Sequence, residues 1–198
     1  MSFELLPALV AGVVATLAMT AGFAVMRATG RTTIDFPLIL GTMVTGDATR
    51  ARAAGFVTHV LVMGGLAFGS LYAGLFDWVG AEGSETWLYG VAFGSLHGGI
   101  AGFGLAALPA VHPRMRANAG EEWPDTTVFR ESPEPVPPTD KPVRGEPRGS
   151  LVAPERPQLT LRAPGPFGAE YGSMTPIGLV LGHLAYGLVF GGLYGTLA

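Results

Sequence analysis

Three histidines are the residues of this sequence whose type and placement could support ligand chemistry. His59, His97 and His183 each stand within a long apolar stretch that is nearly free of charged side chains. A neutral imidazole can bind a metal ion or a haem iron, carry a proton, or hydrogen-bond to a neighbouring helix. Ionisable groups in such stretches are costly to bury and often mark functional sites. The histidines are therefore the first candidates for a site.

The depth of each histidine along its helix indicates which of them can meet. At about 1.5 Å per residue, His59 and His183 both lie roughly 9–13 Å from the same ends of two parallel helices. His97 lies roughly 16 Å from the opposite end of a third helix, near its middle. Two histidines at matched depth can ligate a haem or a metal ion from opposite sides. His59 and His183, with His97 nearby, are the candidate cofactor-binding residues. Hydrogen bonding between helices is the interpretation that we favour for them, and a proton or quinone site is a further alternative.

Helical geometry places His183 more favourably than His59. His183 shares a face with Gly187 and Tyr194, because offsets of four and eleven residues return to nearly the same angle. By helical geometry His59 lies roughly 120° from the Gly65 stripe, closer to Met63 and Ser70. A shared ligand therefore requires the helix of His59 to turn a second face toward His183.

The elements that must position these histidines are four apolar stretches. Charged residues make up 14 % of the 198 residues, against about 25 % in ordinary globular chains. Residues 5–26, 53–76, 86–111 and 171–198 are almost free of charge, and each exceeds the roughly 20 residues that a helix needs to cross a bilayer. The sequence predicts an all-α membrane protein, a four-transmembrane-helix bundle. The first stretch follows an acidic residue, Glu4, so we expect a retained span rather than a signal peptide.

The basic residues fix the expected orientation of the spans. All 12 Lys and Arg residues fall within residues 27–52 and 114–162, whereas the turn between the second and third spans has only acids: Asp77, Glu82 and Glu85. Basic loops are retained in the cytoplasm. We predict a multi-pass cell-membrane protein with loops 27–52 and 112–170 in the cytoplasm and both termini outside. Its expected partner is membrane lipid, and nucleic acid is not expected.

The chain divides into three parts. Residues 1–111 hold transmembrane helices 1–3 together with a short interfacial segment at 34–46, and residues 171–198 form transmembrane helix 4. In the interfacial segment, Asp35 can cap a short helix that has Pro37 in its first turn. This helix is predicted either to lie in the interface or to re-enter the membrane and line a cavity.

Residues 112–170 are compositionally different from the rest. They hold 12 of the chain's 16 prolines, with eight basic and nine acidic residues. So little apolar surface does not offset the entropy lost on ordering. We predict one long disordered cytoplasmic loop.

A glycine motif recurs in the last three spans. Gly, Phe, Gly and Leu keep the same offsets in residues 65–72, 90–97 and 187–194. Small residues at every fourth position let helices approach closely in a membrane. The predicted helix-packing residues are Gly65, Gly69, Gly90, Gly94, Gly98, Gly102, Gly187, Gly191 and Gly195. These stripes serve either the bundle itself or a homo-oligomer.

Other motifs give no sign of catalysis. The chain has no cysteine, and residues 102–107 match a dinucleotide fingerprint only inside a span, where that motif has no strand before it. No acidic residue within a span can orient a histidine. Tyr72, Tyr194, Trp78 and Trp87 are predicted to anchor the outer surface. We expect no enzymatic activity.

The first half of the chain carries a family resemblance. Its motifs are Gly12-x-x-Ala15-Thr16-x-x-Met19-Thr20 and Asp35-x-Pro37-x-x-Leu40-Gly41, with His59 and a glycine-flanked His97 further on. The chain resembles uncharacterised four-span prokaryotic integral membrane proteins of unknown function, which implies a topology and no activity. The predicted role is that of a non-enzymatic accessory or scaffolding subunit, as a homo-oligomer or within a larger membrane complex. A haem- or metal-binding module and a small transporter are the alternatives.

Overall fold

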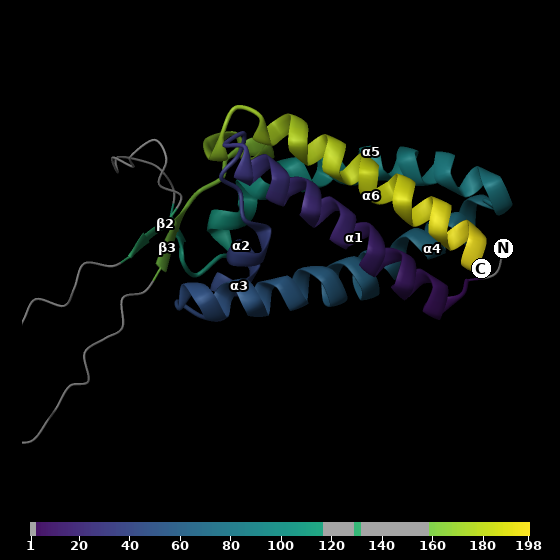
Figure 1. Ribbon diagram of the computed structural model, residues 1–198, viewed down its shortest axis with the longest axis horizontal. Helices are drawn as coiled ribbons and strands as arrows, with labels where there is room; N and C mark the ends of the chain where they lie inside the picture. Colours follow the sequence, from purple (N-terminus) through teal and green to yellow (C-terminus); the bar gives the residue numbers. More distant parts are fainter. Residues whose placement is uncertain (1–2, 117–128, 132–158) are drawn as a thin grey trace, which may run out of the picture.

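The protein is mostly helical in the computed structural model, which describes residues 3–116, 129–131 and 159–198 (Figure 1). In this part of the chain, four helices are long and apolar enough to cross a membrane. They are Leu5–Ala28, Ala48–Val79, Gly83–Ala110 and Thr175–Leu197. The four long apolar helices predicted from the sequence are confirmed in number and place. The second begins earlier than predicted, because Asp47 caps it by accepting a hydrogen bond from the Arg50 N–H at 2.9 Å.

The spans are built from the following elements. The first is α1 (Leu5–Ala28) and the fourth is α6 (Thr175–Leu197). The second joins α3 (Ala48–Val57), the π-helix η1 (Thr58–Gly69) and α4 (Ser70–Val79) without a break. The third joins η2 (Gly83–Glu85), α5 (Thr86–Ala107) and η3 (Leu108–Ala110). A short helix, α2 (Phe36–Thr42), lies between the first two spans.

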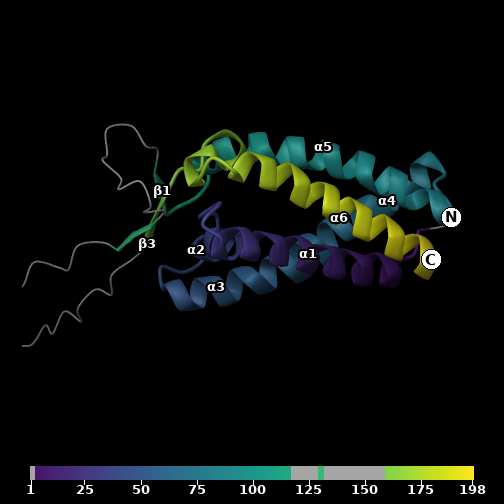
Figure 2. The ribbon, with the colours of Figure 1, turned by 45° about the horizontal axis from the view of Figure 1, so that its top comes forward.

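The fourth span is the centre of the bundle. Helix α6 packs along both α5 and α1, and α1 packs in turn along η1. The spans run side by side along the long axis, with the N- and C-termini at the same end (Figures 1 and 2). Contacts between the second and third spans are few and involve mainly α4 and α5. The two spans therefore separate toward the end that carries α2.

The most extensive helix contact joins α5 and α6, and glycines lie in it. A Cβ atom added to Gly90 would overlap the carbonyl oxygen of Gly187, and one added to Gly187 would overlap that of Gly90. One added to Gly94 would overlap the carbonyl oxygen of His183, and one added to Gly191 that of Thr86. The glycine stripes of the third and fourth spans thus face one another within one chain.

The remaining predicted packing glycines face other partners. Gly65 and Gly69 lie against α1, where added Cβ atoms would come within 2.9 Å of Val13 Cγ2 and 2.6 Å of the Ala8 carbonyl oxygen. Gly98 faces the His183 side chain, Gly102 faces the ring of Phe167, and Gly195 faces Thr86.

The predicted loop of residues 112–170 is folded at both of its described ends. Strand β3 (Leu159–Arg162) pairs in parallel with β1 (Met115–Arg116) and antiparallel with β2 (Phe129–Glu131), giving the order β1-β3-β2. The η4 turn (Pro166–Tyr171) then packs on α5 and α6. Disorder is therefore a wrong prediction for these stretches. Residues 117–128 and 132–158 of that loop lie outside the described residues.

Buried apolar side chains explain why residues 159–171 fold. Leu159, Leu161 and Tyr171 are each no more than 2 % exposed. The Tyr171 hydroxyl donates to the Arg162 carbonyl oxygen at 2.7 Å. Burial raises the pKa of Tyr171 above its ordinary value, and the charge of Arg162 only partly offsets this. The hydroxyl therefore remains a neutral donor, and it ties η4 to β3.

Candidate functional site

A cavity of about 370 Å³ lies among the spans, and all three of the predicted histidines line it. His59 comes from η1, His97 from α5 and His183 from α6. The remaining lining is almost entirely apolar; it includes Met19, Phe36, Ile39, Leu40, Met63, Phe68, Ile100, Leu105 and Leu179. The three histidines predicted from the sequence as site candidates therefore line one cavity in the structure.

The cavity opens to the surface between the second and third spans. Ile100 and Met43 line it and are 64 % and 42 % exposed. Ile100 lies well inside the third apolar span, so this opening faces the zone that a bilayer's hydrocarbon would occupy.

His183 is held in one tautomer by its own helix. Its Nδ1 lies 2.8 Å from the carbonyl oxygen of Leu179, one turn earlier. A carbonyl oxygen can only accept, so Nδ1 carries the proton and Nε2 of the neutral ring is an acceptor. Gly94 and Gly98 pack against the backbone and Cβ of this residue, which fixes the ring at the edge of the cavity.

His97, and not His59, is the ring neighbour of His183. The two ring centroids lie 4.5 Å apart, with the planes at 73°. The ring centroids of His97 and Phe68 lie 4.0 Å apart. The Nδ1 atom of His97 lies 3.3 Å from the hydroxyl oxygen of Tyr72. The prediction gave His97 a secondary place beside a pair of His59 and His183. In the structure, the closest pair of imidazoles is His97 and His183.

Aromatic rings close the cavity on the side of the chain termini. Tyr72 contacts Tyr186 and Phe190, and Tyr194 stacks on Phe190. The Tyr186 hydroxyl donates to the carbonyl oxygen of Gly64 at 3.0 Å. Tyr72 and Tyr194 are each 1 % exposed, so the prediction that they are surface anchors is wrong: they are core residues. Among the predicted anchors, Trp78 and Trp87 are exposed, at 79 % and 45 %.

His59 lies in the irregular part of the second span. Its ring stacks on that of Phe36 in α2, with the ring centroids 5.9 Å apart and the ring planes at 16°. Its Nε2 atom is buried and has no hydrogen-bond partner among the residues that the structure describes. The π-helix around it spans 12 residues and contains the adjacent Gly64 and Gly65. Runs of π-helix are rare and occur often at functional sites.

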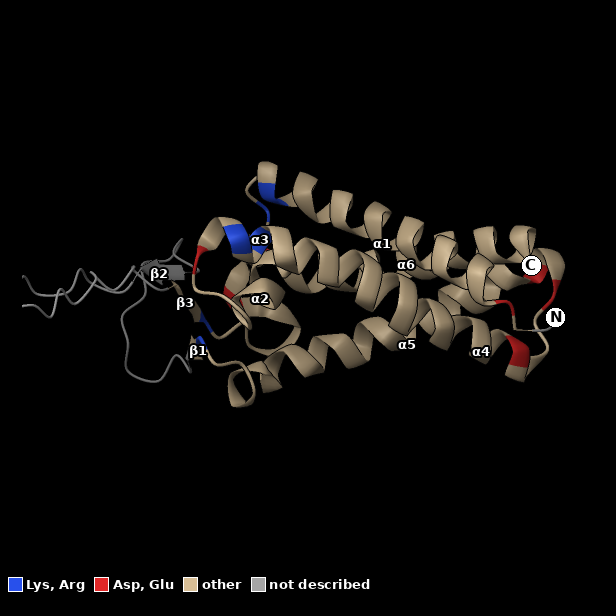
Figure 3. Cartoon of the chain, turned by 90° about the horizontal axis from the view of Figure 1, so that it is seen from below, with Lys and Arg blue, Asp and Glu red and all other residues tan. Residues whose placement is uncertain are grey.

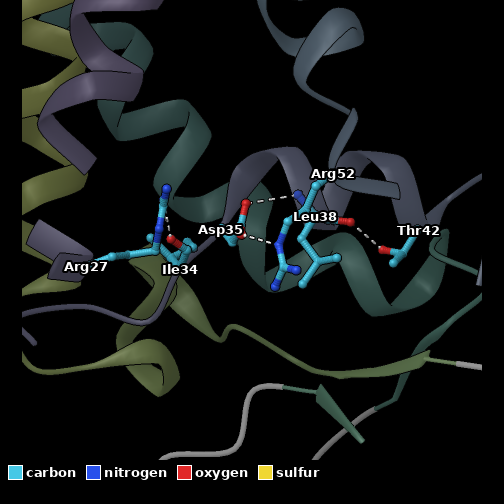
Figure 4. A network of polar contacts seen from close by, with 6 residues as sticks. All are labelled: Arg27, Ile34, Asp35, Leu38, Thr42 and Arg52. Carbon is cyan, nitrogen blue, oxygen red and sulfur yellow. Dashed lines mark hydrogen bonds and ion pairs between the residues drawn. The ribbon is translucent and has the colours of Figure 1, made fainter. Parts of the chain in front are cut away.

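Helix α2 forms the floor of the cavity and is anchored at its N-terminus by charged side chains. The predicted cap is confirmed, because Asp35 accepts a hydrogen bond from the Leu38 N–H at 3.0 Å (Figure 4). Arg52 reaches the same carboxylate at 3.1 Å from α3. Arg27 donates to the Ile34 carbonyl oxygen at 3.0 Å (Figure 4).

The other end of α2 is held by a residue that the sequence did not mark. His112 is 3 % exposed, and its Nε2 lies 2.9 Å from the carbonyl oxygen of Ile39. Its Nδ1 accepts from the backbone N–H of Arg114, whose guanidinium donates to the Thr42 carbonyl oxygen at 2.8 Å. His112 is thus a positioning residue for the floor, outside the cavity. Its neighbours Pro113 and Arg114 are typical of a loop, so nothing in the sequence signals its burial.

The polar groups of the cavity are few, and most of them are imidazole nitrogens. Within the described residues, no group of three or more His, Cys, Asp or Glu side chains is placed to hold a metal ion. The cavity lining has no charged side chain in the part of the chain that the structure describes. The imidazole nitrogens are therefore the main groups that can give orientation and specificity, as a few polar groups do in most apolar ligand pockets.

Fold and site together define a class: helical proteins with four candidate membrane spans and an internal cavity lined by histidines. No protein-family model matches the chain. Comparison with curated proteins and with solved structures likewise finds no match. The resemblance to uncharacterised four-span membrane proteins therefore stays a prediction.

Proposed function

We propose that this is a non-enzymatic integral membrane protein that binds a small lipophilic molecule between its spans. The supporting observation is the 370 Å³ cavity, whose apolar lining carries three imidazoles and opens toward the lipid zone. Its volume falls within the roughly 300–1,000 Å³ typical of ligand pockets. Polar side chains in a membrane core are usually retained for function. An accessory subunit with no ligand would have no need of such a cavity.

The proposed location is the cell membrane, with both termini outside and residues 27–52 and 112–170 in the cytoplasm. Among the described residues, every Lys and Arg lies at the α2 end of the bundle (Figure 3). At the other end, acidic residues lie around the turn between α4 and α5, near both termini (Figure 3). Basic ends are retained inside the cell, which puts α2 and the floor of the cavity on the cytoplasmic side.

The glycine contacts favour a bundle over a dimer built on the same stripes. Gly90, Gly94, Gly187 and Gly191 are occupied by contacts between α5 and α6 of one chain. A homodimer through these stripes would first have to separate the two helices. An oligomer or a larger membrane complex, if formed, uses other surfaces.

Filling the mouth of the cavity is expected to stop ligand binding. Gly104 lines the cavity, and a Cβ atom there would meet no atom within 4 Å. Leucine therefore fits at Gly104 and fills space that a ligand needs. A benzene ring bearing a decyl tail and a photoreactive diazirine is the probe, with labelled peptides mapped by mass spectrometry. We expect Gly104→Leu to reduce labelling of the peptides that contain His59 and His183 at least about tenfold, which is the effect of about 1.4 kcal/mol.

Gly99→Leu is the matched control. Gly99 is on the same helix with equally open surroundings, but it does not line the cavity. Its substitution should leave labelling unchanged, and labelling of the lipid-exposed face of α1 should be equal in all variants. Equal labelling of the His59 and His183 peptides in wild type and Gly104→Leu would exclude the cavity as a binding site. The accessory or scaffolding role would then be the better account.

Haem or metal binding is the second candidate, and the hydrogen bond at His183 favours it. Metal-ligating histidines usually donate their other ring N–H to a carbonyl or a carboxylate, as His183 does to Leu179. If this candidate holds, the purified protein shows a Soret band or a stoichiometric transition metal. His59→Ala and His183→Ala should then each abolish that signal. A colourless, metal-free protein whose two variants lose only thermal stability would exclude it.

A further inference from the structure

The chemistry of the cavity lining defines the class of ligand more closely. The inference that follows rests on the proposed function. We infer that the ligand is an uncharged quinone or quinol: a flat ring with oxygen atoms on opposite edges, seated among His97, His183 and Phe68, with an apolar tail that leaves between the second and third spans.

The absence of charge on the lining excludes charged ligands. The described residues that surround the cavity include no Asp, Glu, Lys or Arg. A charged group placed there would lose its hydration with no counter-ion to offset the cost, which is prohibitive in a site of low dielectric constant. A carboxylic acid, a phosphate or an amine would therefore stay at the membrane surface. The ligand must be neutral.

The three imidazoles call for a ligand with more than one oxygen atom. His183 offers Nε2 as an acceptor, because its Nδ1 proton is committed to Leu179. His97 has Nδ1 paired with the Tyr72 hydroxyl, and when Tyr72 is the donor the His97 Nε2–H is free to donate. His59 has a buried Nε2 without a partner in the described structure. One acceptor, one donor and one open nitrogen match a ring with two oxygens better than a plain hydrocarbon.

Donor and acceptor together also suit both oxidation states of such a ring. A quinone carbonyl oxygen can only accept a hydrogen bond, which the His97 Nε2–H can supply. A quinol hydroxyl can also donate, which the His183 Nε2 can accept. A single hydroxyl can donate to His183 and accept from His97, but it would leave the His59 Nε2 without a partner. Unpaired buried polar groups cost about 1–3 kcal/mol each.

The shape of the cavity agrees with a ring and a tail. The ring centroids of Phe68 and His97 lie 4.0 Å apart, and those of Phe36 and His59 lie 5.9 Å apart. Aromatic rings therefore lie next to the imidazoles. Flat rings pack favourably on such faces. The opening at Ile100 and Met43 is apolar and exposed, as an alkyl or isoprenoid tail requires. Tyr186, on the closed side, is already bonded to Gly64.

Competition against the photoreactive probe tests the ligand class. The competitors are decylubiquinone, decylubiquinol and n-decylbenzene, which shares the ring and the tail but has no oxygen. With wild-type protein in lipid nanodiscs, we expect the quinone and the quinol to displace the probe at concentrations about tenfold below that of n-decylbenzene, because each hydrogen bond to an otherwise unpaired imidazole adds about that factor. Thermal unfolding of each variant verifies that it is folded.

The outcomes separate this inference from the proposed function. His97→Phe and His183→Phe keep a ring but remove the nitrogens. His97→Phe should abolish the preference for the quinone, and His183→Phe should reduce the preference for the quinol but not for the quinone, because the His183 Nε2 can only accept. The probe should still bind both variants. Equal competition by n-decylbenzene in the wild type would overturn the quinone inference and leave lipophilic binding intact. No cavity labelling by the probe in the wild type would overturn both. The wild-type comparison decides the matter even if one histidine variant fails to fold.

Discussion

Replacing Gly187 with leucine is expected to abolish the folded bundle. Gly187 and Gly90 each lie against the other's carbonyl group, so even a Cβ atom at either position overlaps backbone. Backbone atoms of two packed helices cannot move aside as a flexible side chain can. Overpacking in a tight core costs about 1–3 kcal/mol and occasionally more. In a membrane, where helices associate by close packing, separation of α5 from α6 also removes the main contact of the fourth span.

Alanine at the same position tests the contact more finely. Because the overlap begins at Cβ, Gly187→Ala should also lower the melting temperature. Gly98→Ala should be tolerated better, since its Cβ would meet the His183 Cβ at 3.1 Å. The control is Gly192→Leu on the same helix, where nothing lies within 4 Å. Thermal unfolding and size-exclusion profiles in detergent are the measurements. A stable, monodisperse Gly187→Leu protein would show that α5 and α6 do not meet at this point.

Composition and spacing were enough to predict the spans and the members of the glycine stripes. Charge segregation gives four apolar stretches, and hydrocarbon thickness then fixes their number as helices. Spacing alone, however, does not show which stripe meets which. Gly90 and Gly187 face one another, whereas Gly65 and Gly69 face α1. All three stripes carry the same motif, so the choice among partners is made by tertiary packing.

The candidate site was predicted as a set of residues but not as a geometry. The helical angle that placed His59 away from Gly65 assumed α-helical periodicity, yet both residues lie in the π-helix η1. A π-helix turns its side chains through different angles, so a calculation for an α-helix fails there. The sequence shows no broken helix in this span; the adjacent Gly64 and Gly65, with their low helix propensity, are the only local sign.

The short apolar stretch after the proline-rich region was missed for a compositional reason. Residues 159–171 contribute few apolar side chains to a long polar loop, so an average over 112–170 hides them. This segment folds because the side chains of Leu161 and Tyr171 are buried against the bundle and β1. Tyr72 was misread in a similar way, since its position near a span end resembles that of an interfacial residue. In the structure it lies inside the bundle, against His97.

Cysteine labelling is expected to give opposite results at the two ends of the bundle. The chain contains no cysteine, so each introduced thiol reports alone. Ser84 is exposed in the acidic turn between the second and third spans, and Thr49 is exposed at the start of α3 beside Arg50 and Arg52. Because basic loops are retained in the cytoplasm, Ser84→Cys should react with an impermeant maleimide in intact cells. Thr49→Cys should react only after the membrane is permeabilised.

A third position shows that the reagent reports on exposure to water rather than on exposure alone. Ser95 is exposed on the surface of α5 but lies in the middle of a candidate membrane span. Ser95→Cys should therefore stay unlabelled before and after permeabilisation, because its surroundings are lipid and a thiolate does not form there. Full labelling at Ser95 would mean that this face contacts water, which contradicts a membrane-embedded bundle. Reversed labelling of Ser84 and Thr49, with Ser95 protected, would keep the bundle but invert it, placing the floor of the cavity at the outer surface.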